Sequence, residues 1–315
     1  MTTTSLKLLG ILFMTIDHIG EFIPNTPIWF RWIGRLAYPL FAFCCVQGVL
    51  HTRNRKRYLL RLYIWNIIMT IVITYLNACY VTENWMQNRV SNNNFSTLFQ
   101  LALLICVLDI AINKKRHYKK AIFIYICYQA LMLICMFAIA FFVIDVWWTQ
   151  YAVEYTFCSL FWNEGNNCFF VLLGLVFYFP YVQEKYIGEN NTTFQKKCNF
   201  RCFIFYFLYI GIWSLTEIFD IMSRVFFRVC LYFGNTVEES VEFVLEILGV
   251  DIIELNTFTP PSIEYVFYEN YQWMMIFSAV FFLFYNGQKG RGIKYFFYFY
   301  YILHVVLLFF IGKYL

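Results

Sequence analysis

The sequence has little charge. Charged residues make up 14% of the 315 positions, whereas about 25% is usual for a soluble domain. Hydrophobic residues reach 61% and aromatic residues 23%. No soluble fold of this length has enough interior for that much apolar surface, so lipid must surround most of the chain. This composition excludes a soluble enzyme, a disordered chain and a nucleic-acid-binding module.

Several other features are missing from the sequence. The long apolar runs lack the strict alternation of membrane β-strands, and we find no internal repeat of the kind typical of many secondary transporters. The first run has no small-residue cleavage site, so we expect a retained helix rather than a removed signal peptide. No low-complexity segment or second soluble domain is apparent, and we expect one integral-membrane domain over residues 1–315.

The apolar runs predict an all-α, polytopic membrane helical bundle. Runs of about 17–25 residues are long enough to cross a bilayer as helices. We count about nine, within a range of about 9–11. We place them near 5–23, 28–50, 58–80, 96–112, 121–148, 167–183, 202–222, 267–286 and 295–312.

The positive charges predict the orientation of this bundle. Of the 24 Lys and Arg residues, 18 are Lys7 or lie in the loops 51–61, 113–120, 184–201 and 286–294. Nine spans with a cytoplasmic N-terminus place all of these loops on one side, as the positive-inside rule requires. We therefore expect a protein of the bacterial cytoplasmic membrane with its C-terminus outside.

An acidic loop on the opposite side covers residues 223–266. The stretch 223–270 contains eight acidic and two basic residues. Within it, valine and leucine recur at helical spacing, and Thr236 with Glu239 forms a capping-box pattern. We expect an amphipathic helix over 235–250 on the outer face. A plain solvated acidic loop is the alternative.

The eleven cysteines show no metal-binding spacing, and we expect no metal. Most of them lie inside apolar spans, where cysteine usually behaves as a small hydrophobic residue. Cys158 and Cys168 share a predicted outer loop, so they are either a disulfide pair or chance neighbours.

Ionisable residues inside the spans share a depth. Asp17 and His18 lie near the outer end of the first span, and Arg31 and Arg35 lie near the outer start of the second. Counting 1.5 Å per helical residue places them roughly 5–10 Å below the outer boundary. Because such residues are costly in a membrane, they indicate function or pairing.

Further polar residues extend this set. Glu217 and Asp220 reach a similar level on one face of the seventh span, and His304 lies about midway along the last. We expect Glu217, Asp220, Arg31 and His304 to bind or orient an acceptor. For His304, a buried histidine bonded across helices is the alternative.

His18 and Asp17 are expected to take different roles, because neighbouring helical residues point about 100° apart. The unperturbed pKa of histidine, about 6.5, suits proton transfer, so His18 is the candidate base. Asp17 is the candidate for orienting or packing, and Arg35 would stabilise an anionic oxygen. The alternative is an ion pair with Arg35 that only fixes helix packing.

Two blocks of sequence resemble the TraX family of membrane proteins. The first contains Thr15-Ile16-Asp17-His18-Ile19-Gly20 and Arg31-Trp32-Ile33-Gly34-Arg35-Leu36-Ala37-Tyr38-Pro39. The second contains Tyr285-Asn286-Gly287 and continues to Leu303-His304. The resemblance is dense over 5–65 and 283–312, and between them it is one of hydropathy alone.

The resemblance implies acyl transfer. The family is named after a pilin N-acetylase and is similar to membrane acyltransferases that use cytoplasmic acyl-CoA, with an intramembrane histidine and a nearby arginine in the chemistry. It implies that His18 and Arg35 take these roles, with Asp17 before the histidine as in TraX-like sequences. It also implies an outer-face amine or hydroxyl acceptor, such as a glycan, polymer, peptide or pilin-like subunit.

The basic loops supply candidates for binding the phosphates of acetyl-CoA or another acyl-CoA. These are Arg53, Arg55, Arg57, Arg61, Lys289 and Arg291. Topology and contact with anionic lipid are the alternative explanation. For the whole protein, a small-molecule transporter and a non-catalytic membrane scaffold remain alternatives to the enzyme.

Overall fold

The computed structural model describes residues 1–81, 89–113, 117–143, 147–161, 168–187, 192–219, 221 and 262–315. These residues divide into two compact units. The first unit contains Met1–Leu40, Phe179–Gly290 and Leu315, and the second contains Phe41–Tyr178 and Arg291–Tyr314. Each unit is described by itself below. The single domain expected from the sequence stays a prediction.

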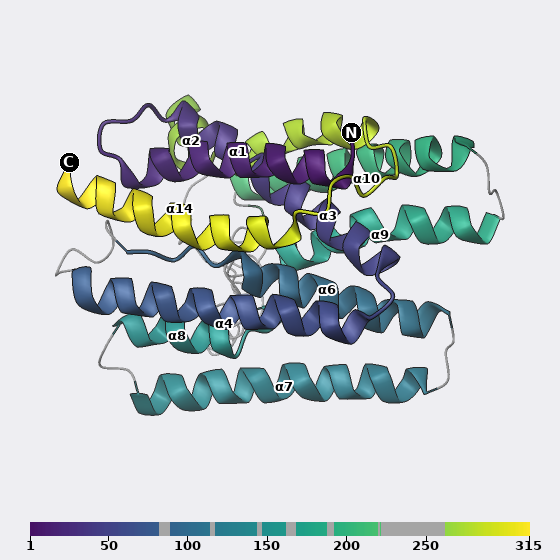
Figure 1. The fold of residues 1–315 in the computed structure, drawn as a ribbon, viewed down its shortest axis with the longest axis horizontal. Helices are drawn as coiled ribbons and strands as arrows, with labels where there is room; N and C mark the ends of the chain where they lie inside the picture. The colour runs from purple at the N-terminus through teal and green to yellow at the C-terminus, as the bar shows by residue number, and fades with distance from the viewer. Residues whose placement is uncertain are drawn as a thin grey trace, which may run out of the picture. The chain divides into compact units, whose positions relative to one another are not determined.

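Helices occupy all nine predicted ranges, and the described residues contain no strand (Figure 1). In chain order these ranges hold α1 (Thr3–Phe22), α2 (Trp29–Gly34) with α3 (Ala37–His51), α4 (Arg55–Tyr80), α6 (Asn94–Ile112), α7 (Tyr118–Val143), α9 (Phe169–Ile187), α10 (Thr192–Ile218), η2 (Gln272–Ser278) with α13 (Ala279–Leu283), and α14 (Lys294–Tyr314). Two further elements are α8 (Trp147–Thr156) and a π-helix, η1 (Tyr265–Glu269). The all-α prediction is confirmed.

Within the part of the chain that the structure describes, six helices are long and apolar enough to cross a membrane. They are Trp29–His51, Arg55–Tyr80, Asn94–Ile112, Tyr118–Cys135, Thr193–Ile218 and Tyr295–Tyr314. Large apolar side chains are exposed along these helices, as lipid contact requires. The chain is therefore a helical membrane protein, for which the predicted count of about nine spans is approximate.

In the first unit, the start of α1 is anchored to the turn that follows α13. The backbone N–H of Thr3 donates to the carbonyl of Gln288 at 2.9 Å, and that of Thr4 donates to the carbonyl of Lys289 at 3.1 Å. Gly290 has a φ of 76°, and a Cβ there would overlap Thr2, so glycine is required at this turn. These bonds satisfy N–H groups that a helix start leaves unpaired.

In the second unit, α8 packs against α4 and α7 (Figure 1). It turns back beside α7 and ends near the midpoints of α4 and α7. There the Asn66 side chain donates to the Tyr155 carbonyl at 2.7 Å, and Gln129 accepts from the Leu160 N–H at 2.8 Å. The segment after α8 therefore lies at mid-helix depth, which is possible in a membrane because protein surrounds it.

One predicted outer loop differs in the structure, and another lies mostly outside the described residues. Cys158 was expected in an outer loop, but it is buried at this mid-helix level, and Cys158 and Cys168 are both free thiols. The predicted amphipathic helix over 235–250 lies outside the described residues, as does most of the acidic loop 223–266.

Candidate functional site

Five ionisable residues of the first unit come together at the C-terminal end of α1 and along α2 with its C-cap. We call Asp17, His18, Glu21, Arg31 and Arg35 the charged cluster. The last turns of α1 supply the first three, and α2 with its C-cap supplies the arginines. Equal depth was the basis for expecting Asp17, His18, Arg31 and Arg35 to be neighbours, and the structure brings these four together.

Asp17 is held by both arginines. Its two carboxylate oxygens each accept from Nη2 of Arg35 at 2.7 Å, and Oδ1 lies 3.1 Å from Nη1 of Arg31. Nη1 of Arg31 also donates to the Asp17 backbone carbonyl at 3.1 Å. Charge-assisted bonds of this kind fix the geometry of both partners. Asp17 therefore connects α1 to α2, and its expected role in orienting or packing stays a prediction.

Two glycines allow α1 and α2 to approach this closely. A Cβ built at Gly34 would overlap the Asp17 side chain. A Cβ at Gly20 would come within 2.8 Å of the Cβ of Phe30. Small residues at helix contacts are typical of membrane proteins because they let the backbones meet. Gly20 and Gly34, which lie in the two segments of the first TraX-like block, thus have a packing function.

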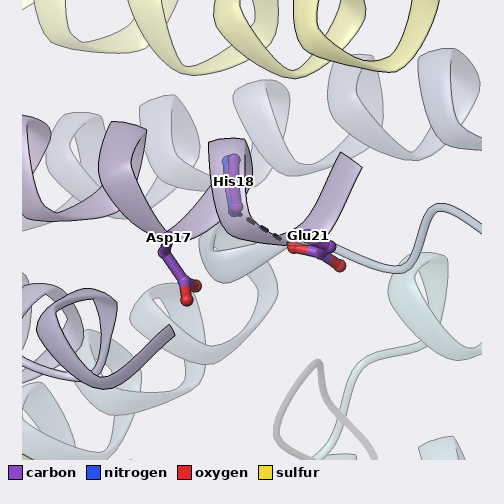
Figure 2. Close-up of side chains that lie close together, drawn as sticks. All are labelled: Asp17, His18 and Glu21. Carbon is purple, nitrogen blue, oxygen red and sulfur yellow. Dashed lines mark ion pairs between the residues drawn. The ribbon is translucent and has the colours of Figure 1, made fainter. Parts of the chain in front are cut away.

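His18 and Glu21 lie on one face of α1, while Asp17 points to another side (Figure 2). Nε2 of His18 is 3.9 Å from Oε2 of Glu21, and the His18 side chain is only 3% exposed. Glu21 also accepts from Nη1 of Arg31 at 3.0 Å. Sequence reasoning missed Glu21, although its position three residues after His18 on a helix could have indicated it.

The carboxylates of the charged cluster could in principle hold a metal ion with His18. One ligand atom from each of Asp17, His18 and Glu21 lies within 4.8 Å of the other two. However, Nη1 of Arg31 already contacts both carboxylates. A guanidinium in this position repels a cation. It also occupies the oxygen lone pairs that would coordinate a metal ion. The donor set therefore suits an ion-pair network better than a metal, and the absence of a metal stays a prediction.

A distant segment of the first unit covers Arg35. The guanidinium carbon of Arg35 lies 5.5 Å from the centroid of the Tyr271 ring, within cation–π range. Two hydrogen bonds hold this segment to the residues around Arg35. Trp32 Nε1 donates to the Phe267 carbonyl at 2.8 Å, and Ser278 Oγ donates to the Leu36 carbonyl at 3.1 Å. Tyr271 was not predicted, because more than 200 residues separate it from Arg35 in sequence.

Arg35 keeps one unused hydrogen-bonding edge. Its Nε donates to the Arg31 carbonyl at 3.3 Å, and its Nη2 binds Asp17. Among the described residues, no acceptor bonds to Nη1. This nitrogen lies in a side chain that is 16% exposed and could donate to an anionic oxygen of a substrate.

Comparison with known sequences identifies the family. The sequence model described as "TraX protein" matches residues 2–190, which is more than half of the chain. The chain belongs to the TraX family. The match includes the first dense block and continues through residues 66–190, where we had found only similar hydropathy. The second block, 283–312, lies outside it.

One curated protein is also similar in sequence to this chain. The chain is 29% identical over 113 residues to a "Probable fimbrial assembly protein FimC, serogroup H1" of Dichelobacter nodosus. The alignment covers 35% of this chain and 46% of the relative, so the chain spans about half the length of this relative. No solved structure matches.

The other predicted acceptor residues of this TraX-family chain are Glu217, Asp220 and His304. Glu217 is exposed on α10 and does not belong to the described Asp17–His18–Glu21 group. Asp220 lies outside the described residues. His304 belongs to the second unit, where it is buried, and its Nδ1 lies 2.8 Å from the Tyr300 carbonyl. Their acceptor roles stay predictions.

The predicted phosphate-binding residues differ in availability. Arg55 pairs with Asp109 at 2.6 Å, and Arg61 donates to the Tyr298 hydroxyl at 3.0 Å. The remaining candidates are exposed at the surface: Arg53, Arg57, Lys289 and Arg291. Lys289 belongs to the first unit and the others to the second.

The second unit also contains a buried set of neutral polar side chains, which we call the amide network: Asn66, Asn93, Gln100 and Gln129. Asn93 donates to the side-chain oxygen of Asn66 at 2.8 Å, and Gln129 donates to that of Gln100 at 3.1 Å. Gln100 also donates to the Cys158 carbonyl at 2.6 Å. The amide network thereby holds the segment after α8, and sequence reasoning did not predict it.

Proposed function

We propose that this TraX-family protein is a membrane-embedded acyltransferase that moves an acetyl or other short acyl group from cytoplasmic acyl-CoA to an amine or hydroxyl at the outer face. The observation that carries the proposal is the arrangement of the charged cluster. The buried His18 imidazole lies beside the Glu21 carboxylate. Asp17 holds the neighbouring Arg35 through Nη2, and among the described residues Nη1 of Arg35 makes no hydrogen bond.

In the proposed reaction, His18 is the general base. It accepts the proton of the acceptor amine or hydroxyl as the acceptor nitrogen or oxygen attacks the thioester carbon. The oxyanion that forms receives a hydrogen bond from Nη1 of Arg35. The carbon–sulfur bond then breaks, and the CoA thiolate takes the proton from the His18 imidazolium, which restores the neutral base. Glu21 would stabilise the imidazolium that exists between these steps, because its carboxylate is 3.9 Å from Nε2.

Asp17 would act in this reaction as a positioning residue. A guanidinium that is free to rotate would lose entropy when it meets the oxyanion. The two bonds at 2.7 Å from Nη2 to Asp17 remove that freedom beforehand. Preorganised donors of this type are usually worth more than flexible ones in a site with little water.

The exposed basic residues are the candidates for binding the CoA phosphates. Arg53 and Arg57 are exposed at the start of α4, whereas Arg55 and Arg61 already have partners within the protein. We therefore assign the phosphate contacts first to Arg53 and Arg57, with Lys289 and Arg291 as further candidates. The family and the fimbrial relative favour a pilin-like or other peptide acceptor.

One observation favours a transporter as the second candidate. The helix α8 stops at mid-helix depth and is followed by a non-helical segment, and transporters often build substrate sites from interrupted helices. A transporter would move a substrate without releasing CoA, so the two functions can be separated experimentally.

The test is CoA release. Purified protein in detergent is incubated with acetyl-CoA and candidate acceptors, and released CoA is measured by chromatography. We expect His18→Ala to lower the rate about 100- to 10,000-fold, as loss of a general base does. Cys127→Ala, an exposed change in the second unit, should leave the rate unchanged. CoA release that survives in His18→Ala would exclude the proposed role, and substrate flux without CoA release would favour the transporter.

A further inference from the structure

Gln47 in α3 is a buried amide without a partner. Gln47 is only 2% exposed. Among the described residues, neither Nε2 nor Oε1 of its side chain makes a hydrogen bond. Burying an amide without hydrogen bonds is unfavourable, and the membrane interior supplies no water to replace them. The Gln47 side chain therefore has both a donor and an acceptor available for a ligand.

Gln47 lies one helical turn inside the basic end of the second unit. Nδ1 of His51 is 2.9 Å from the Gln47 backbone carbonyl, and His51 itself is exposed. The chain continues from His51 to Arg53, a candidate for phosphate binding. One turn of α3 thus leads from the surface, at the predicted cytoplasmic side, to the buried amide.

The neighbouring face of α3 is already occupied. The Tyr58 hydroxyl donates to the Cys45 carbonyl at 3.4 Å, and a Cβ at Gly48 would come within 2.7 Å of that hydroxyl. Packing against α4 therefore uses Cys45 and Gly48. Gln47 lies about 100° around the helix from Gly48, which separates its side chain from this contact.

Other buried glutamines of the same unit behave differently. Gln100 donates to the Cys158 carbonyl and accepts from Gln129, and Gln129 also accepts from the Leu160 N–H. Both have donors and acceptors in use. The fold can therefore satisfy a buried glutamine where the role is structural, and Gln47 stands apart from that rule.

A good partner for a lone amide is another amide, since each offers both an N–H donor and a carbonyl acceptor. The pantetheine arm of an acyl-CoA is narrow and carries two secondary amides. We propose that Gln47 binds the pantetheine arm of the donor, with Nε2 donating to an arm carbonyl and Oε1 accepting from an arm N–H. This proposal rests on the proposed acyltransferase function.

The test compares Gln47→Leu with Gln129→Leu. Three probes are titrated into each full-length protein in detergent: acetyl-CoA, S-acetylpantetheine, which has the arm alone, and adenosine bisphosphate, which has the nucleotide alone. The thermal midpoint of each free protein is also recorded. Leu has a similar volume to Gln and no polar atoms, so it removes the hydrogen bonds with little change in packing.

We expect Gln47→Leu to weaken acetyl-CoA binding about tenfold, the size expected for two lost hydrogen bonds. Binding of S-acetylpantetheine should weaken by the same factor, and that of adenosine bisphosphate should not change. The free Gln47→Leu protein should keep or raise its thermal midpoint, whereas Gln129→Leu should lower it.

Three results would overturn the proposal. A thermal midpoint that falls as far in Gln47→Leu as in Gln129→Leu would show that Gln47 has a structural partner. Unchanged acetyl-CoA binding would show that the donor makes no hydrogen bond to the Gln47 amide. If the unsubstituted protein binds neither acetyl-CoA nor adenosine bisphosphate, the proposed function itself fails, and this outcome is distinct from the other two.

Discussion

The charged cluster of the first unit and the amide network of the second both place polar groups among apolar helices, yet they use those groups differently. In the amide network, side-chain amides bond to one another and to backbone, and Oδ1 of Asn93 is its one atom without a hydrogen bond among the described residues. In the charged cluster, Nη1 of Arg35 makes no hydrogen bond to any residue that the structure describes.

Polar residues inside a membrane protein can thus either hold its structure or stay available for chemistry. A satisfied neutral network gives rigidity but has nothing left to offer a substrate. A cluster of paired charges with one unused donor can be preorganised and still react. A substitution confined to the charged cluster should therefore lower mainly activity, and one confined to the amide network should lower mainly stability.

The largest expected effect comes from the charged cluster. Arg35→Ala removes the proposed oxyanion donor, so CoA release should fall about 100- to 1,000-fold. Arg31 still pairs with Asp17, and this should limit the loss of folding. Arg35→Lys keeps the charge but cannot form the contact with both carboxylate oxygens of Asp17. Its rate of CoA release should lie between those of Arg35→Ala and the unsubstituted protein. A rate for Arg35→Ala close to that of the unsubstituted protein would contradict the oxyanion role.

The amide network should respond in stability instead. Gln129→Leu leaves the Leu160 N–H and Oε1 of Gln100 buried without this partner. The cost should be about 2–4 kcal/mol, measured as a lower thermal midpoint or denaturant midpoint. CoA release per folded molecule should stay within about twofold at temperatures where the variant is folded, which corresponds to under about 0.5 kcal/mol. A selective loss of activity would place the network in the reaction.

A smaller effect is expected from the contact between α1 and α2. In Gly34→Ala the new methyl group must displace Asp17, at a cost of about 1–3 kcal/mol, and CoA release should fall because Arg35 loses its fixed partner. Gly211→Ala in α10 is the matched control. It has no atom within 4 Å of the added Cβ, so it should stabilise the helix by about 0.5–1 kcal/mol. Equal effects of the two changes would disprove the packing argument.

The positions of the long helices could be predicted from sequence because a long apolar run is a local signal. Helix α8 could not. Its sequence contains Gln150 and Glu154 and is too short to span, and its position depends on partners such as Asn66 on another helix. The contact of Asp17 with Arg35 was among the expected alternatives, since depth can be counted along a helix. Tyr271 required the tertiary fold, because nothing local connects it to Arg35.

The anchored start of α1 fixes the position of His18, the proposed general base, along the helix axis. Thr3 and Thr4 are tied to the carbonyls of Gln288 and Lys289, and His18 follows on the same uninterrupted helix. A single residue inserted between them would move the imidazole by about 1.5 Å along the axis and turn it by about 100°. The length of α1 is thus constrained as well as the identity of the histidine, because an insertion would move His18 and Glu21 together away from Arg31, which contacts Glu21 at 3.0 Å.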